Sequence, residues 1–324
     1  MSAPAQLYLY DAQGADSEVA LEAGMLERLA DNTLLWIDLP GPDAAQFADV
    51  VGKLGLDARL PAALRDPGSQ FRVANYGAYQ HFPVCVPAPD GKDRPPVRLD
   101  FVVGENWLLT AHDGRVGFLR EFRDQDRGET MTGALSGAAF AASLLDWHLE
   151  TYFREVAGIE DEIDALDDRI LEDASDDALL ASILHVRRRV SRLRRLLADQ
   201  RPVFYGLERP DMVAGPTGDS GDIISRLAAR YERALDEIER TRDLILGSFD
   251  LLTSRVSQQT NDLVKALTFF TGVIGTVAAI AGLFGMNFDP PFFNSGSTGF
   301  FAVVAGLTIL AAIAFVWARH RRWL

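Results

Sequence analysis

Between Lys265 and Asp289 the chain reads KALTFFTGVIGTVAAIAGLFGMNFD, and no charged residue stands between these two ends. At a rise of about 1.5 Å per residue, a helix over residues 266–286 is roughly 30 Å long, which matches the hydrocarbon thickness of a bilayer. A second charge-free run follows. A buried core helix is the alternative for either run, but two such runs side by side favour membrane spans. We therefore expect transmembrane helices at 266–288 and 299–318.

The charges that flank the two spans predict their orientation. Basic residues fill the tail at 319–324, whereas the connecting loop at 289–298 carries only Asp289. Because basic residues favour the cytoplasmic side, the tail is expected there, and two crossings return the chain to the side on which it started. We expect a multi-pass protein of a bacterial inner membrane, with both termini in the cytoplasm and the loop in the periplasm.

The amino-acid composition bears on the binding partner and on the cellular compartment of the protein. The 324 residues carry a formal net charge of -14, which argues against nucleic acid because phosphate binding needs a basic surface. Cys85 is the only cysteine, so no intrachain disulfide can form and a reducing compartment is the simpler interpretation. The first 16 residues lack the basic start and the apolar run of a signal peptide. The part before the spans is therefore expected in the cytoplasm.

Residues 1–136 predict a mixed α/β domain. Short apolar segments alternate with helical patterns, and clusters of proline and glycine separate them. Strands are expected at 7–10, 34–39 and 99–103, and helices at 18–30 and 43–54.

The middle of the chain predicts long helices. Apolar residues recur roughly every three or four positions from Gly137 to about Glu208, which indicates a helical hairpin within 137–221, joined near 173–177. A stalk helix over 222–265 meets no proline before the first span, so the two are expected to be continuous. A rod of roughly 95 Å survives only by packing against neighbours, which predicts several subunits around an axis. The expected fold class is α+β.

Two runs of charge lie in the hairpin. Ten acidic residues fall between Glu160 and Asp177, with Arg169 as the only basic residue among them. A solvated helix face and a surface that concentrates cations are both open interpretations of this run. Six arginines follow at positions 187, 188, 189, 192, 194 and 195, and we expect them to pair with the acidic helix across the hairpin. Nucleic-acid binding is disfavoured, since no aromatic residues are interleaved with the arginines.

Signatures of catalysis are missing from the sequence. The histidines are scattered, without the His-x-x-x-His or Cys-x-x-Cys spacing of a zinc site. No glycine-rich phosphate loop with Lys-Ser or Lys-Thr and no Gly-x-Ser-x-Gly elbow occurs. We expect a protein that is not an enzyme and that has no cofactor.

The end of the first span carries the most specific motif, Gly285-Met286-Asn287, with Asp289 just beyond it. The run from Arg242 to Asp289, together with the ending Arg322-Trp323-Leu324, resembles the CorA family of divalent metal cation channels, which includes a ZntB-like branch. The resemblance covers the helices from about Gly137 well and the N-terminal domain only in outline.

This resemblance implies a homopentameric funnel whose first spans line a central pore and whose second spans surround them. The selectivity filter is then Gly285, Met286 and Asn287, and the metal-binding positions are Asn287, Asp289 and Asp250. Mg²⁺ demands octahedral oxygen ligands and gives up water reluctantly, so a ring of neutral amide and carbonyl oxygens can hold the hydrated ion. Asp289, just outside, attracts cations without forming the narrowest ring. The divalent cation is both substrate and, by resemblance, a cytoplasmic regulator.

Further pore-lining positions follow by counting back from Asn287 along one helix face at the seam period. They are Ala278, Gly275, Thr271, Thr268, Val264, Asn261 and Asp250. By resemblance, Leu267 and Val264 form a hydrophobic constriction that gates by dewetting, Asn261 a polar ring and Asp250 an acidic ring. Plain helix packing is the alternative for Leu267 and Val264.

The sequence departs from the family pattern at Thr276, where many members have a proline, and at Ala278, where a threonine is usual. The outer loop also lacks the Met-Pro-Glu-Leu signature of magnesium transporters. Uptake of Mg²⁺, and also of Co²⁺ or Ni²⁺, driven by the membrane potential is the expected function. A ZntB-type zinc transporter is the nearest alternative, and a non-conducting two-span scaffold or sensor is a third.

Overall fold

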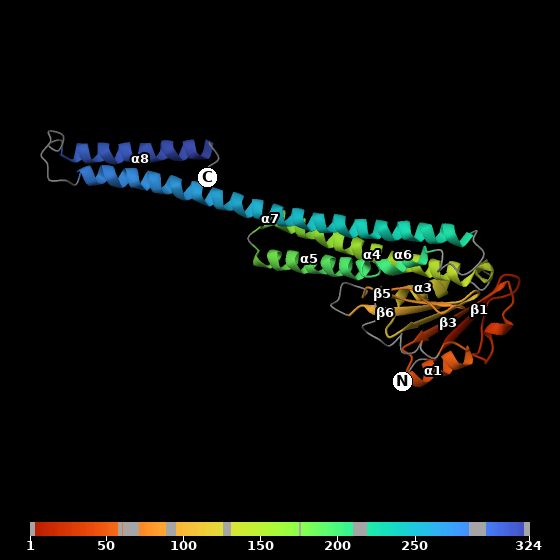
Figure 1. Cartoon of the computed structure of the whole chain (residues 1–324). Helices are drawn as coiled ribbons and strands as arrows, with labels where there is room; N and C mark the ends of the chain where they lie inside the picture. The colour runs from red at the N-terminus through yellow and green to blue at the C-terminus, as the bar shows by residue number, and fades with distance from the viewer. Residues whose placement is uncertain are drawn as a thin grey trace. The chain divides into compact units, whose positions relative to one another are not determined.

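The computed structural model describes residues 4–57, 60, 71–88, 95–125, 131–174, 176–209, 219–284 and 296–320. The chain divides into two compact units. Unit 1 comprises Met1–Leu166 and Leu180–Gly247, and unit 2 comprises Asp167–Leu179 and Ser248–Leu324. The expected combination of an N-terminal α/β part, a long helix that continues into the first span and a second apolar helix is confirmed (Figure 1).

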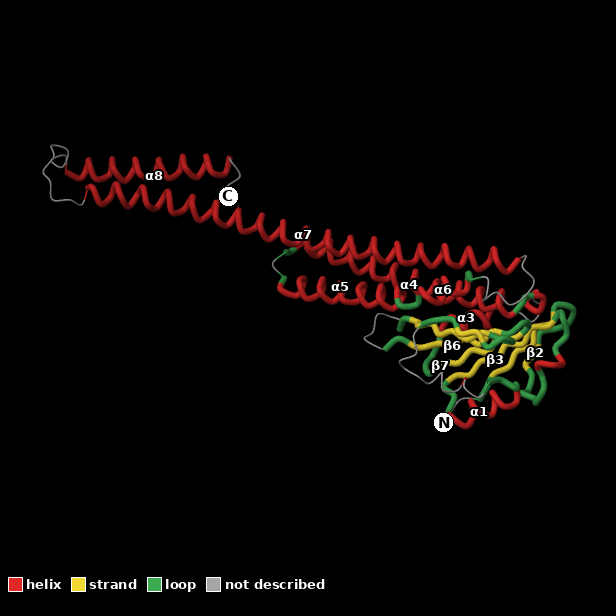
Figure 2. Tube along the Cα trace, viewed as in Figure 1, coloured by secondary structure: helices red, strands yellow, loops and turns green. Residues whose placement is uncertain are grey.

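A mixed sheet forms the first part of unit 1 (Figure 2). Within the described residues it has seven strands in the order β2-β1-β3-β7-β6-β5-β4. All neighbours are antiparallel except the central pair β3–β7, which is parallel. The strands are β1 Gln6–Asp11, β2 Ser17–Glu18, β3 Thr33–Pro40, β4 Ala74–Asn75, β5 Gln80–Val86, β6 Val97–Val103 and β7 Trp107–His112.

The central strands are covered on both faces, which explains why β3 reads as an almost continuous apolar run. Leu35, Ile37 and Leu39 point to one face and join a buried cluster with Phe47 of helix α1 (Ala44–Lys53). Trp36 points to the other face, where its ring lies 5.6 Å from that of Phe140. Figure 1 shows α1 on one side of the sheet and the long helices on the other.

Local sequence explains where α1 begins. Asp43 is its N-cap, and one carboxylate oxygen accepts hydrogen bonds from the backbone of Ala45 at 3.0 Å and of Gln46 at 2.8 Å. The helix predicted at 43–54 is therefore confirmed. The helix predicted at 18–30 is wrong, because this segment holds β2, a 3-10 turn η1 at Leu26–Arg28 and Gly24 with φ of 69°, a left-handed conformation that ends helical structure.

Helix α3 (Gly117–Gln125) and a 3-10 turn η3 (Met131–Ala134) lead into the helical part. Its helices are α4 Gly137–Glu172, α5 Asp177–Ala198, α6 Arg201–Leu207 and α7 Asp219–Phe284. The expected start at 137 and the joint near 173–177 are confirmed. Helix α7 begins three residues before the expected residue 222 and continues unbroken for 66 residues.

Two glycines sit where the chain passes very close to other backbone. A Cβ on Gly137 would lie 2.3 Å from the carbonyl oxygen of Gly104 and 2.7 Å from that of Trp107. The amide of Gly137 also donates to the carbonyl of Glu105 at 2.7 Å. A Cβ on Gly133 would lie within 3 Å of three backbone atoms. The start of α4 is thus held directly against the β6–β7 turn.

Buried apolar side chains at a spacing of three to four residues hold the helices of unit 1 together. Examples are Tyr152, Val156, Ile159 and Ile163 on α4, Ile183, Val186, Val190 and Leu193 on α5, and Leu227, Tyr231, Ala234 and Ile238 on α7. Polar contacts join α4 to α7, since Arg230 pairs with Asp146 at 3.0 Å and Thr241 donates to Glu160 at 2.9 Å. Each helix therefore turns one stripe inward and leaves the opposite side exposed.

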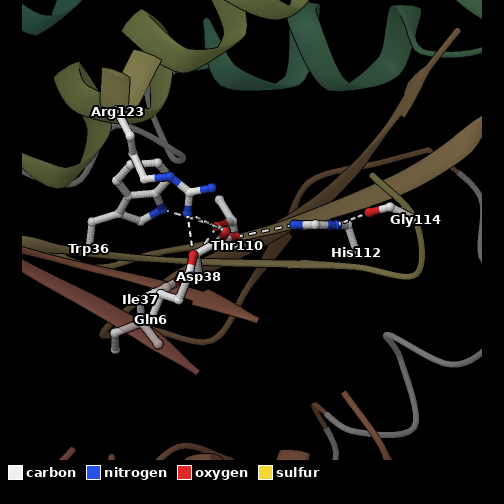
Figure 3. A network of polar contacts seen from close by, with 8 residues as sticks. All are labelled: Gln6, Trp36, Ile37, Asp38, Thr110, His112, Gly114 and Arg123. Carbon is white, nitrogen blue, oxygen red and sulfur yellow. Dashed lines mark hydrogen bonds and ion pairs between the residues drawn. The ribbon is translucent and has the colours of Figure 1, made fainter. Parts of the chain in front are cut away.

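A network of polar contacts surrounds the buried carboxylate of Asp38, between the sheet and α3 (Figure 3). Arg123 donates to this carboxylate at 3.0 Å and Thr110 donates at 2.7 Å, while Nε2 of His112 lies 3.4 Å away. Burial alone would raise the pKa of Asp38, but contacts with His112, Thr110 and Arg123 outweigh it and lower the pKa. The sequence gives no sign of this network, because its members come from β3, β7 and α3.

The apolar stretches of membrane length lie in unit 2, which α7 enters at Ser248. Gly221–Phe284 within α7 and Ser297–His320 within α8 (Gly296–His320) are long and apolar enough to cross a bilayer. Helix α7 is continuous through Thr276, whose hydroxyl donates to the carbonyl of Gly272 at 2.8 Å. The absence of proline at this position therefore leaves an unbroken helix.

Candidate functional site

The two apolar helices of unit 2 each shield one stripe of the other. On α7 the half-buried residues are Ala266, Phe269, Val273, Val277 and Ile280. On α8 the half-buried or buried residues are Gly299, Val303, Leu307, Ala311, Ala314 and Ala318. Both sets recur every three to four residues, so each is a single face of its helix. Figures 1 and 2 show these two helices running alongside one another.

The residues predicted to line a pore lie on the other side of α7. Val264, Leu267, Thr268, Thr271, Gly275 and Ala278 are all exposed. At about 100° per residue, this set is centred almost opposite the stripe that faces α8. Val264 and Leu267 are 54% and 67% exposed. The structure thus brings these six positions onto one free face, although their role in a pore stays a prediction.

Two further predicted positions lie closer to the start of α7 within unit 2. Asp250 and Asn261 are exposed, and the same helical count places both near the edge of the free face. Within the described part of the chain, no basic side chain pairs with Asp250. Its carboxylate is therefore available to an ion or to another chain.

One hydroxyl of the free face has a defined orientation. The Thr268 hydroxyl donates to the carbonyl of Val264 at 2.8 Å, so its hydrogen points along the helix. The oxygen lone pairs remain directed away from this bond and can accept hydrogen bonds from water around a cation. The face therefore combines small or apolar surface with oxygen acceptors.

The motif at the end of the first span lies outside the described residues. Gly285, Met286, Asn287 and Asp289 all fall there, and α7 ends at Phe284, directly before the motif. The basic tail from Arg321 onward also lies outside. The filter and the metal positions Asn287 and Asp289 stay predictions from the sequence.

The described residues of a single chain do not form a cage for a metal ion. Across the described ranges, no three His, Cys, Asp or Glu side chains come together in a way that could hold one. A ring of several copies repeats each acidic or amide side chain around an axis, so single residues such as Asp250 gain partners there. The geometry of α7 is compatible with such a ring, because the six exposed positions predicted to line a pore share one face of the helix.

The predicted pairing of the arginine run with the acidic helix is confirmed at Arg189. Arg189 binds Glu155 and Glu162 of α4, each at 3.0 Å. Arg194 instead pairs with Glu239 of α7. Periodicity explains the difference, because the six arginines cover several sides of α5 and only one side faces α4.

Comparisons with known proteins agree with this architecture. The family model of the CorA-like Mg²⁺ transporter protein matches residues 31–321. The cobalt/magnesium transport protein CorA of Thermotoga maritima is 27% identical over 190 residues, which is 56% of this chain and 51% of the relative. The chain thus spans about half the length of that relative.

A relative of similar length gives the same picture. The cobalt/magnesium transport protein CorA of Methanocaldococcus jannaschii is 22% identical over 298 residues, covering 91% of this chain and 92% of the relative. The solved structure of the CorA magnesium transporter from this organism superposes with a TM-score of 0.74 at 20% identity and covers all of both chains. Both relatives are named transport proteins, in agreement with the expectation that this chain is not an enzyme.

The family match extends from just before strand β3 to the end of the second apolar helix, well beyond the segment that carried the resemblance in the sequence. The similarity in fold covers the whole chain. On these grounds the chain belongs to the family of CorA-like Mg²⁺ transporter proteins.

Proposed function

We propose that five copies assemble with α7 of each copy around a central axis and conduct divalent cations across the inner membrane into the cytoplasm. The observation that carries this proposal is the contrast between the two exposed helix faces in unit 2. The free face of α7 presents threonine hydroxyls and small residues at Thr268, Thr271, Gly275 and Ala278. Such a face suits a water-filled axis better than lipid.

The exposed side of α8 has the opposite character. It presents bulky apolar side chains that are each at least 59% exposed, namely Phe301, Ile309, Ile313 and Val316. Lipid tails accept these side chains without loss of hydrogen bonds. The contrast supports an inner ring of α7 helices and an outer ring of α8 helices.

Each group of residues on α7 then has a proposed task. Asp250 and Asn261 form polar rings that a cation meets on the cytoplasmic side, with both termini on that side. Val264 and Leu267 form an apolar constriction that closes when water leaves it. Gly285, Met286 and Asn287 form the filter, with Asp289 at the periplasmic mouth. A divalent ion gains roughly 4.6 kcal/mol across 100 mV, which drives uptake without a nucleotide.

Mg²⁺ is the proposed main ion, with Co²⁺ as a second. Both relatives described above are named for cobalt and magnesium transport. A filter of neutral amide and carbonyl oxygens supports the same choice, since it can hold a hydrated Mg²⁺ without removing its water.

The test is flux through purified full-length protein in liposomes with an imposed potential and a separate fluorescent reporter for Mg²⁺, Co²⁺ and Zn²⁺. Mg²⁺ flux is expected in the wild type, and Asn287→Ala is expected to reduce it at least tenfold. Asn294→Ala, a second asparagine of the predicted loop, is the matched control and should leave flux unchanged. Zn²⁺ flux that needs a proton gradient, with no Mg²⁺ flux, would identify a zinc transporter. No flux of any metal would favour a scaffold or sensor.

A further inference from the structure

The exposed side of α5 carries a cluster of arginine side chains. Arg187, Arg188 and Arg195 are exposed, and within the described residues none of them has an ion-pair partner. Between the side chains is a hollow of about 380 Å³, lined by Leu184, Arg187, Arg188, Ser191, Arg192 and Arg195. We call these six residues the basic face.

The basic face points away from the interior of the helical part. Ile183, Val186 and Val190 of the same helix are buried, and the helical count places Arg188 and Arg195 on the opposite side. Arg189 and Arg194 lie on the flanks, where they bind α4 and α7. The fold thus uses the flanking arginines, whereas Arg187, Arg188 and Arg195 have no ion-pair partner among the described residues.

Concentrating positive charge in this way opposes helix formation. Arg188 and Arg192 are four residues apart and Arg195 follows after three more, so these side chains are neighbours on the helix surface. Like charges at this spacing destabilise a helix. The chain as a whole has a formal net charge of -14, so this patch is also unlike the average surface. An anionic surface bound to the basic face removes the repulsion.

A complementary row of acids lies on α4. Asp161 and Asp164 are exposed, three residues apart and without a described partner. Glu162, between them, binds Arg189, and this contact sets the register of the two antiparallel helices. Asp161 is next to Glu162 and Arg188 is next to Arg189, so the acidic row and Arg188 lie at similar heights along the hairpin.

We propose that Asp161 and Asp164 of one copy bind the basic face of a neighbouring copy, with Arg188 at the centre of the contact. The two surfaces differ from one another, so the contact is heterologous and can close into a ring. This proposal rests on the proposed function in one respect only, namely that several copies are arranged around an axis. A phosphate-bearing ligand or an anionic lipid would neutralise the basic face but would leave the acidic row unexplained, whereas a second copy accounts for both.

Exposed ion pairs contribute little to stability individually, but complementary charge fixes register and excludes wrong contacts. The proposed contact therefore selects how neighbouring hairpins align. It should also weaken as salt concentration rises, because both partners are exposed.

Cross-linking tests the contact directly. Two full-length chains with different affinity tags are co-expressed, one with Asp164→Cys and the other with Arg188→Cys, and the purified assembly is treated with a short bis-maleimide. A product that contains both tags is expected. Cys85 is buried and should not react, which the wild-type assembly verifies. Replacing Arg188→Cys by Arg120→Cys, an exposed arginine on α3, is the matched control and should give no such product.

Charge reversal provides the second measurement. Arg188→Glu or Asp164→Arg alone should raise the concentration at which the assembly dissociates about threefold to tenfold at low salt, and the double variant should restore it. Additive effects in the double variant, or no product with both tags, would overturn the proposal. Loss of binding to vesicles rich in phosphatidylglycerol in Arg188→Glu, with assembly unchanged, would overturn it in favour of a lipid partner.

The failure of this proposal is distinguishable from failure of the proposed function. Cross-linking without metal flux would support the contact and contradict the function. Flux with an intact assembly but without cross-linking would contradict the contact alone.

Discussion

Nε2 of His148 donates a hydrogen bond to Oε1 of Gln200 at 3.0 Å, and both side chains are completely buried. The same Gln200 oxygen accepts from the backbone amide of Cys85 at 3.0 Å, while the Gln200 amide donates to the hydroxyl of Tyr152 at 2.8 Å. One side chain between α5 and α6 therefore joins α4 to strand β5.

Burial of His148 makes the stability of unit 1 depend on pH. Burial disfavours the imidazolium and lowers the pKa of His148 to about 4, from an ordinary value of 6.5. Between these values only the unfolded chain binds the proton, so the free energy of unfolding should fall as the pH falls, by roughly 3 kcal/mol in total. Denaturant unfolding of the full chain in detergent between pH 7.5 and 4.5 measures this. His148→Leu should flatten the profile there, and a profile unchanged from that of exposed His185→Leu would contradict the assignment.

Asp38→Asn should destabilise the sheet by about 1–3 kcal/mol, because it removes the charge that Arg123 and His112 face in a buried site. The lowered pKa gives a second signature. The carboxylate stabilises the fold above its ordinary pKa of 3.8, and this contribution is lost as the pH falls below that value. Tryptophan fluorescence reports the change, since Trp36 donates to Thr110 in the same network. Asp49→Asn, at an exposed pair with Lys53, is the control and should have little effect.

Arg189→Met should lower the free energy of unfolding by about 1 kcal/mol, because Arg189 binds two carboxylates and both it and Glu155 are largely shielded from solvent. The neighbouring Arg188→Met should leave unfolding of a single chain unchanged, since Arg188 has no partner among the described residues. Chemical unfolding below the concentration of assembly compares the two. Equal effects would show that charge number, and not the contact with α4, governs stability here.

Leu267→Ser should increase metal flux severalfold at a potential where the wild type is mostly closed, because a hydroxyl holds water in an apolar constriction. Phe270→Ser is the control, as Phe270 is 49% exposed but lies about 110° around the helix from the centre of the free face of α7. Flux in liposomes distinguishes the two variants. The same small change in both would mean that Leu267 only packs against a neighbouring helix.

Strong periodic signals in the sequence predicted the long elements well. The start of α4 at Gly137, the joint after Glu172 and the continuity of α7 followed from apolar spacing and from the absence of proline. The wrong helix at 18–30 has an apolar pattern of the same kind, but its residues pack under the sheet as strand and turn. Short segments are decided by tertiary packing, which one-dimensional spacing does not contain.

For the polar and exposed residues too, the sequence was informative within one helix but not between distant elements. Counting along one helix predicted which residues of α7 share a face, because that depends only on helical geometry. The polar network of Asp38 and the cluster of Gln200 were not predicted, since their members are brought together from distant strands and helices. The predicted pairing of the arginine run with α4 holds at Arg189 but not at Arg194, which pairs with α7, because charge sign alone does not say which side of α5 each residue occupies.

The bare backbone at Gly133 and Gly137 has a consequence for engineering. At both positions a single methyl group would collide with main-chain atoms, which cannot rotate aside as a side chain does. An alanine at either position should therefore push this part of the chain away from the backbone that it contacts. Gly158, by contrast, has open space around it on the same helix α4 and tolerates the identical change. Comparing the stability of the three alanine variants separates disturbed packing between the sheet and the helices from an effect on helix formation. The comparison is direct because the same methyl group is added at each site.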